Sequence, residues 1–155
     1  MPITINGSGT VTGISAGGLP DAIITAPELS GAQTGSAPIY GCRAWVNFDG
    51  TRNEADTGAS TNGANVKIRA SGNVTSVLKN AVGDYTVTFT TAMPDANYAA
   101  VGTANLSSLT TANTAITFNL SGTGTTPQAA SAFRIWAKQA GTLIDCDFVN
   151  VTIFR

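Results

Sequence analysis

Strict alternation of apolar and polar residues marks the segment that follows the turn signal Gly83-Asp84. Tyr85, Val87 and Phe89 fall on one side, with threonines between them. A period of two is typical of a strand that is buried on one face. The segment MPDAN at 93–97 interrupts the pattern, because proline has no N–H to donate and Asp and Asn favour turns. An apolar run at 98–101 follows, so we predict a strand, a turn and a second strand.

Similar short patterns recur along the chain from residue 42 onward, and no segment has the length and periodicity of a helix of ten or more residues. The last of them, 143–154, is expected to be the final strand, nearly continuous, with Val149, Val151 and Ile153 on one face and Phe148 and Phe154 on the other. About eight strands at this spacing predict an all-β domain, a β-sandwich or jelly-roll-like fold. The other segments that we expect to form strands are 43–49, 64–70, 74–79, 115–120 and 131–138.

Residues 1–41 differ from the rest, because glycine and proline recur there with few large apolar residues between them. Such a segment cannot bury a core by itself. We therefore divide the chain into an extended N-terminal arm, 1–41, and a β-domain, 42–155. The arm is either a flexible leader or a segment that is ordered by its partners.

Composition narrows the range of functions. Charged residues make up 11% of the 155 residues, well below the roughly 25% of an ordinary globular protein. The net charge of −1 offers no basic surface for nucleic acid. No apolar run approaches the length of a membrane span, and no charged leader of a secretory signal is present. We expect a protein that is made in a cytoplasm and does not insert into membranes.

Three blocks carry a resemblance to a known family: AWVNF at 44–48, IRAS at 68–71 and GDYTVTFTTAMPDANY at 83–98. In this order they resemble the C-terminal domain of tail fibre proteins of tailed bacteriophages, over roughly residues 42–155. The resemblance implies a structural protein of the virion tail, a short fibre or fibre tip that forms a homotrimer. The arm, 1–41, would bind tail or baseplate proteins, and the domain would contact a glycan or protein of the host cell surface.

Residues for covalent catalysis are scarce. The chain has no histidine, which removes the usual activator of serine and cysteine nucleophiles. Asp145 and Asp147 flank Cys146 and are expected to point the same way from one strand, as a glycosidase-like pair or half of a calcium site. A solvated polar rim explains them more simply, and the same holds for Glu54 and Asp56. We predict that the chain is not an enzyme and binds neither a cofactor nor a metal.

The two cysteines, Cys42 and Cys146, each lie in an alternating apolar run. We interpret both as small buried apolar residues. The alternative is a disulfide between them that closes a long loop.

Two long polar segments are candidates for receptor recognition, because loops on a rigid β-domain vary at little cost to its core. They are 49–65 and 121–130, both rich in glycine and free of large apolar anchors. The alternative is that both are only long turns. The candidate residues in them are Arg52, Asn53, Glu54, Asp56, Thr123, Thr125 and Gln128.

Trp45 and Trp136 lie opposite the apparent core side of their strands, beside Arg43 and Arg134 respectively. Each tryptophan is part of an interface between copies, part of the core, or a platform for a ligand.

Two other functions remain open at this point. One is a capsid decoration or cement protein, and the other is a carbohydrate-binding module.

Overall fold

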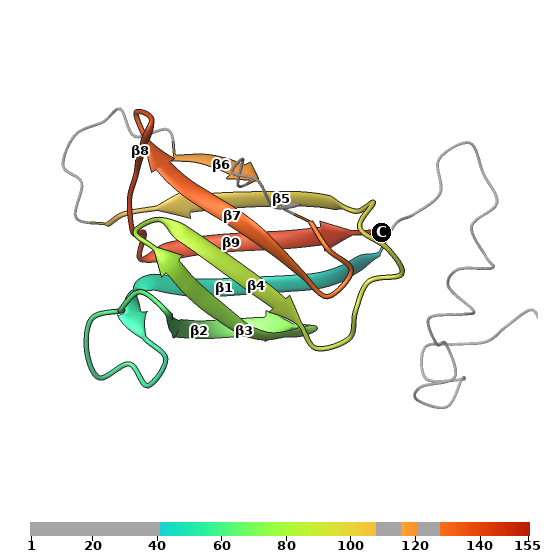
Figure 1. Ribbon diagram of the computed structural model, residues 1–155, viewed down its shortest axis with the longest axis horizontal. Coiled ribbons are helices and arrows are strands. Elements are labelled where there is room, and N and C mark those ends of the chain that lie inside the picture. The colour runs from blue at the N-terminus through green and yellow to red at the C-terminus, as the bar shows by residue number, and fades with distance from the viewer. Residues whose placement is uncertain (1–40, 108–115, 121–127) are drawn as a thin grey trace, which may run out of the picture. The chain divides into compact units, whose positions relative to one another are not determined.

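Among the residues that the structure describes, nine strands joined edge to edge form one antiparallel sheet (Figure 1). The structure is a computed structural model that describes residues 41–107, 116–120 and 128–155. The strands are β1 (Cys42–Asn53), β2 (Ala64–Gly72), β3 (Val74–Ala81), β4 (Asp84–Phe89), β5 (Ala99–Asn105), β6 (Ile116–Leu120), β7 (Ala132–Gln139), β8 (Thr142–Leu143) and β9 (Phe148–Phe154).

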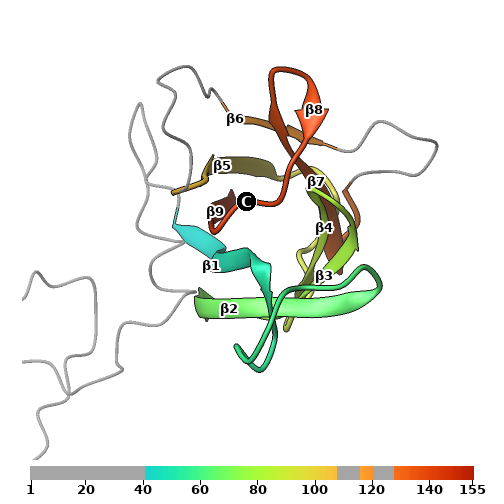
Figure 2. The same cartoon turned by 90° about the vertical axis from the view of Figure 1, so that its left-hand side faces the viewer.

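The sheet is curled so that its two halves face each other (Figure 2). Its strand order is β5-β9-β1-β2-β3-β4-β7-β6, and the short β8 pairs with β7. The bend lies between β2 and β3, which pair only at Ala64↔Lys79 and Asn65↔Leu78 before they diverge. We call β5-β9-β1-β2 the first layer and β3-β4-β7-β6 the second layer. The predicted all-β fold is confirmed, and its two layers belong to one continuous sheet.

Alternation in the sequence explains which side of each strand is buried. In β4 the burial follows the predicted period, with Tyr85, Val87 and Phe89 inside. Inward residues of β7 and β9 meet them from both layers, among them Ile135 and Val151. Burying a side chain of this kind stabilises the fold by about 1.5–3 kcal/mol, so the enclosed apolar side chains are the main source of stability.

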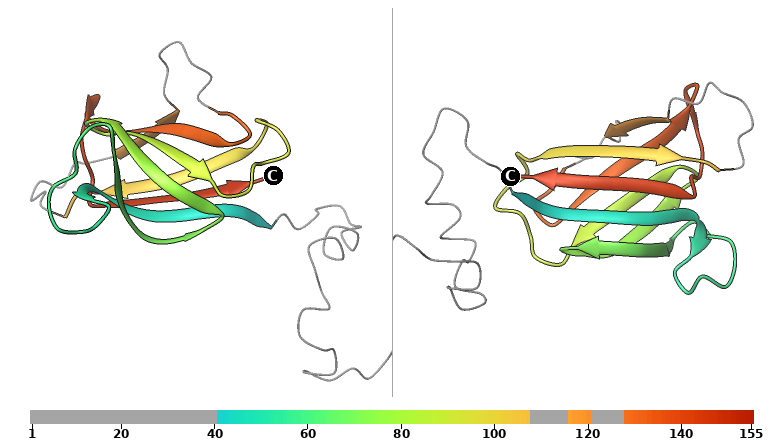
Figure 3. Two further views of the ribbon diagram at one scale, coloured as in Figure 1. Left: turned by 60° about the horizontal axis from the view of Figure 1, so that its bottom comes forward. Right: turned by 180° about the vertical axis from the view of Figure 1, so that it is seen from behind.

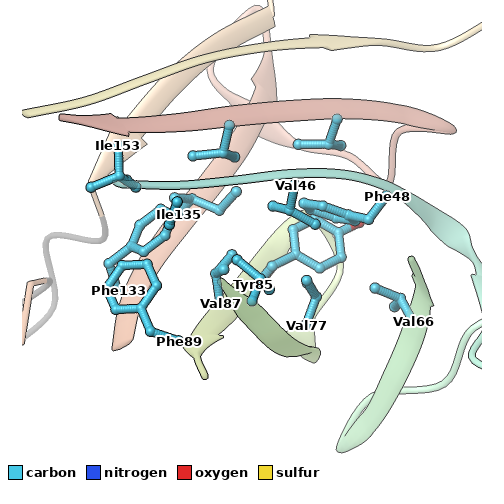
Figure 4. Close-up of a cluster of buried hydrophobic side chains, with 14 of the residues drawn as sticks. Val46, Phe48, Val66, Val77, Tyr85, Val87, Phe89, Phe133, Ile135 and Ile153 are labelled. Carbon is cyan, nitrogen blue, oxygen red and sulfur yellow. The ribbon is translucent and has the colours of Figure 1, made fainter. Parts of the chain in front are cut away.

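Aromatic rings occupy the middle and one end of this core (Figure 4). Phe48 of the first layer meets Tyr85 of the second edge-to-face, with ring centroids 5.1 Å apart. Phe89 stacks on Phe133 at 5.6 Å, and Tyr98 touches both rings edge-on. The contact between Phe48 and Tyr85 links the two layers directly, whereas Phe89 and Phe133 lie on neighbouring strands of the second layer.

The MPDAN segment does more than turn the chain. β4 pairs with β3 and β7 in the second layer, whereas β5 pairs with β9 in the first. Residues 93–97 therefore carry the chain from one layer to the other. The carboxylate of Asp95 accepts the backbone N–H of Asn97, which holds the turn that the sequence predicts.

The prediction of one strand over 143–154 is wrong. β8 ends at Leu143, β9 begins at Phe148, and the residues between are not in a strand. The carbonyl of Cys146 accepts the N–H of Gly50 instead of a ladder partner, and the Asp145 side chain turns into the domain. Within β9 the faces are as predicted, with Val149, Val151 and Ile153 buried.

The prediction for the two cysteines is correct for one of them. Cys146 is fully buried among apolar side chains, but Cys42 is exposed. The pairing of β1 with β9 is irregular between Cys42 and Ala44. Because of this irregularity, the side chain of Cys42 does not point inward as the alternation predicts. Both thiols are free. They lie near opposite ends of β1, since Cys146 binds Gly50 while Cys42 pairs with Phe154.

Asn73 occupies the connection between β2 and β3 and pins the bend of the sheet. Its backbone is left-handed, with φ 57°, which asparagine tolerates better than most residues. Its side-chain amide donates to the carbonyls of Arg43 and Thr91, and its side-chain oxygen accepts the N–H of Thr91.

Apart from Gly41, the predicted arm lies outside the described residues.

Candidate functional site

The outward side of β5, β9 and β1 forms a continuous surface (Figure 3, right). Strand register sets its side chains in rows: Val101 beside Thr152 and Trp45, and Thr103 beside Asn150 and Asn47. We call this surface the outer face. It consists of Trp45, Asn47, Val101, Thr103, Phe148, Asn150 and Thr152.

Trp45 lies flat against the neighbouring strand. It pairs with Gly72 of β2, and a β-carbon on Gly72 would come within 2.4 Å of the indole nitrogen. The absence of a side chain at Gly72 therefore leaves the space that the indole ring occupies. The side opposite this contact is free, and 44% of Trp45 is exposed. Such a ring can stack on a flat ligand or pack against another protein.

Amide and hydroxyl groups lie between the apolar residues of the outer face. The Asn47 amide donates to the side-chain oxygen of Asn150, whose own amide donates to the hydroxyl of Thr103 at 3.3 Å. Each bond crosses from one strand to the next. The row is uncharged, and its lateral bonds hold the amides in place while their remaining donors and acceptors face outward.

Phe148 closes one end of the outer face and is 43% exposed. The guanidinium of Arg69 covers part of its ring, with the guanidinium carbon 4.2 Å from the ring centroid. Arg69 is itself held by Asp49, whose carboxylate accepts a hydrogen bond of 2.7 Å. Cation, ring and carboxylate therefore form a fixed group beside the uncharged row.

The end of β1 and the loop that follows it hold four of the predicted receptor residues close together. Arg52 forms an ion pair of 2.9 Å with Asp56, and both side chains are about half exposed. This bond lowers the pKa of Asp56 below its ordinary value. The side-chain oxygen of Asn53 accepts the N–H groups of Thr57 and Gly58, which shapes the loop from within, while Glu54 remains exposed.

Gln128 is the one candidate residue of the second predicted receptor segment that lies among the described residues. Thr123 and Thr125 lie outside the described residues. Gln128 donates to the carbonyl of Tyr98, next to the start of β5. The first residue of β5 pairs with Phe154, as Cys42 does, so Gln128 lies at the end of the domain where β1 begins. The Arg52–Asp56 loop follows the other end of β1, so these residues do not form one surface.

Trp136 lies on the outward side of the second layer, away from Trp45. It is half-buried, and the ammonium of Lys138 lies 4.3 Å from its ring centroid. Its indole nitrogen is buried and makes no hydrogen bond of ordinary geometry with the described residues. On the neighbouring strand the carboxylate of Asp84 accepts two bonds from Arg134, of 2.7 and 2.5 Å. The two tryptophans therefore belong to separate surfaces.

The expectation that Asp145 and Asp147 point the same way is wrong. Asp147 accepts hydrogen bonds from the backbone and hydroxyl of Ser107 at the surface. Asp145 points inward and accepts bonds from Tyr85, at 2.7 Å, and Lys79, at 2.5 Å. No group of three or more His, Cys, Asp or Glu side chains that could hold a metal ion occurs among the described residues.

Lys79 is a site residue that the sequence interpretation missed. It is almost fully buried, with 5% of its side chain exposed, and its ammonium contacts Asp145 and the hydroxyl of Ser60. The sequence does contain a signal for it, because Lys79 lies two residues after Val77 and therefore on the same, inward side of the strand. A lysine in a core position is rare unless it is paired.

The geometry of the outer face suits binding by stacking, apolar contact and hydrogen bonding. In the described part of the chain there is no helix that could cross a membrane. No family model, curated protein or solved structure matches the chain. The function must therefore be inferred from these residues and their arrangement.

Proposed function

We propose that the chain is a structural protein of a bacteriophage tail, a short fibre or fibre tip that contributes to host attachment. The three sequence blocks at 44–48, 68–71 and 83–98 support the tail fibre part of the proposal. The all-β domain fits that role, because a rigid sheet can carry contact surfaces on its faces and ends.

The observation that carries the proposal is the outer face. Trp45, Val101 and Phe148 are 44%, 58% and 43% exposed on it, and the side chains between them are uncharged. Protein interfaces are enriched in aromatic residues and depleted of charge at their centre, as the outer face is. We infer that the outer face binds further copies of the chain. The number three is taken from the tail fibre resemblance.

The position of the Arg52–Asp56 loop supports a role in attachment. The chain enters the domain at Cys42 and runs along β1 to Asn53, so the loop lies at the opposite end from the entry point. If residues 1–41 dock to the tail or baseplate, the loop faces away from the particle. Exposed charges there can reach a glycan or protein on the host surface.

Molar mass measured by light scattering tests the self-association. We expect a trimer at micromolar concentration and its loss in Val101→Lys, because a buried charge without a partner destabilises an interface. Val82→Lys is the matched control, since Val82 is a similarly exposed valine (47%) away from the outer face. A monomeric wild-type chain, or equal effects of both variants, would contradict the proposal.

A carbohydrate-binding module is the second candidate, because Trp45 beside an uncharged amide row also suits a sugar ring. A monomeric wild-type protein that loses sugar binding on Trp45→Ala would favour this candidate. Binding of the chain to isolated capsids, with no binding to isolated tails, would instead indicate a capsid decoration protein.

A further inference from the structure

A buried polar cluster lies at the end of the domain that carries the Arg52–Asp56 loop. It consists of Lys79 of β3, Tyr85 of β4, Asp145 from the segment before β9, Ser60 from the β1–β2 loop, and the backbone of Gly50 and Gly83. The ammonium of Lys79 is 2.5 Å from one carboxylate oxygen of Asp145, Oδ2, and 2.9 Å from the hydroxyl of Ser60. The cluster brings a primary amine into contact with a carboxyl group, with 5% of the lysine side chain and 22% of the aspartate side chain exposed.

The other carboxylate oxygen of Asp145, Oδ1, accepts two hydrogen bonds. The hydroxyl of Tyr85 donates to it at 2.7 Å and the backbone N–H of Gly83 at 2.8 Å. Burial, together with the Asp145 charge, raises the pKa of Tyr85 well above its ordinary value, so its hydroxyl keeps its proton. Two fixed donors on one oxygen are the arrangement that stabilises the negative charge of a tetrahedral intermediate in acyl transfer.

We propose that Lys79 and Asp145 react with each other to form an intramolecular amide cross-link between Nζ and Cγ. The pair is held at contact distance by β3 and by the segment before β9, so the reaction is unimolecular and gains the advantage of proximity. Neither a cofactor nor an outside reactant is needed, because the only by-product is water.

The reaction balances in three steps. A proton passes from Nζ to Oδ2 along their hydrogen bond, which leaves a neutral amine and a carboxylic acid. The amine lone pair attacks Cγ, and the charge that develops on Oδ1 is stabilised by the two donors from Tyr85 and Gly83. The bond from Cγ to Oδ2 then breaks, and the leaving hydroxyl takes a second proton from the nitrogen and departs as water.

Ser60 holds the amine in position for the attack. Its hydroxyl accepts a hydrogen bond from Lys79 and donates one of 2.6 Å to the carbonyl of Gly50. The link would join strand β3 to the segment that leads into β9, across 66 residues of sequence. A covalent bond at this end of the domain suits a protein that bears load, although the chemistry does not depend on the proposed function.

Mass spectrometry of the intact, denatured protein tests the cross-link. We expect the folded wild-type chain to be lighter than its sequence by one water. Trypsin should then fail to cut after Lys79 and yield the fragment 70–134 joined to 139–155. The free fragment 70–79 should be absent. A wild-type chain that is folded by circular dichroism, has its full sequence mass and releases fragment 70–79 would overturn the proposal.

Variants distinguish a mass loss caused by the cross-link from a loss of water by another reaction. Lys79→Arg keeps the positive charge but offers no amine, and Lys138→Arg is the matched control that should cross-link as the wild type does. An Asp-Gly succinimide at 49–50 also loses water, but that loss would persist in Lys79→Arg and lie in fragment 44–52. Tyr85→Phe, which retains the ring, should slow the formation of the linked fragment. An unchanged rate would remove Tyr85 from the mechanism.

Discussion

The hydroxyl oxygen of Tyr85 lies 2.2 Å from the position that a β-carbon on Gly50 would occupy. The same β-carbon would be 3.0 Å from the carbonyl oxygen of Cys146. Tyr85 is fully buried and its ring packs edge-to-face against Phe48, so it cannot move away into solvent. Close approach of three segments therefore requires glycine at position 50.

We expect Gly50→Ala to destabilise the domain by about 1–3 kcal/mol, the usual cost of overpacking a filled interior. Urea denaturation measures the change. Gly58→Ala is the control, because a β-carbon there would meet only the Asn53 side chain at 3.6 Å, an ordinary contact. Equal stability of Gly50→Ala and the wild type would show that Tyr85 is not held as tightly as the geometry indicates.

The alternation of apolar and polar residues predicted correctly those strands in which every second side chain points toward the opposite layer. β4 and β7 are of this kind, because Val87 and Ile135 have apolar neighbours on each side. It failed at 143–147, where Asp145 has buried partners that are distant in sequence. It also failed at Cys42, where an irregularity in strand pairing changes the side to which a residue points. Both failures depend on contacts between distant segments, which a local pattern does not contain.

The outer face was predicted only in part. Periodicity placed Trp45 opposite the core, but it could not indicate that Val101 and Asn150 lie beside it. That neighbourhood follows from the pairing of β5 with β9 and of β9 with β1. The predicted receptor residues show the same limit, because Gln128 and Arg52 prove to lie at opposite ends of the domain.

The pair formed by Asp84 and Arg134 should make stability dependent on pH. Burial disfavours the charged form of Asp84, but the hydrogen bonds from Arg134 and Asn80 outweigh it and hold the pKa of Asp84 below its ordinary value of 3.8. A depressed folded-state pKa means that the contribution is present above the unfolded-state pKa. It is lost as the pH falls through the folded-state value.

We expect Asp84→Asn to lower the free energy of unfolding near neutral pH by roughly 1–3 kcal/mol, because Arg134 loses a buried charged partner. The difference from the wild type should begin to shrink below about pH 4, where the carboxyl of the unfolded chain takes up a proton. It should disappear once the pH has fallen through the lower folded-state pKa, where the native carboxyl is neutral as well. Urea denaturation at several pH values measures it. Asp56→Asn is the control, since that exposed pair with Arg52 is screened by water. A difference that stays constant with pH would contradict the assignment.

The two thiols should differ sharply in reactivity. Burial, with the charges of Asp147 and Asp145, raises the pKa of Cys146 to about 12, and the side chain is fully buried. Thiolate is the reactive form, so Cys146 should be inert in the folded protein. Cys42 is exposed.

We therefore expect one thiol per chain to react with a maleimide under native conditions and two in denaturant. Cys42→Ser should abolish native labelling and leave one reactive thiol after unfolding. Rapid labelling of Cys146 in the native protein would mean that the segment before β9 opens readily, which would also separate Asp145 from Lys79.

The last prediction concerns host attachment and rests on the proposed function. The ion pair between Arg52 and Asp56 lies beyond one end of β1, and the exposed pair between Arg155 and Asp95 lies near the other end. Both pairs are exposed to a similar extent, so their removal should affect stability little and equally. Asp95 also accepts the N–H of Asn97, a hydrogen bond that the amide oxygen of asparagine can accept in its place. The two pairs therefore form a comparison in which position is the main difference.

Virions that carry Arg52→Gln with Asp56→Asn should adsorb to host cells less well than virions that carry Arg155→Gln with Asp95→Asn. The reason is that the first pair faces away from the point at which the chain enters the domain. Asn53 is retained in both variants, so its bonds to Thr57 and Gly58 preserve the loop. Incorporation into the particle is measured in parallel by quantifying the chain in purified virions. Equal adsorption at equal incorporation would exclude the loop as the receptor contact and leave the outer face as the surface to test next.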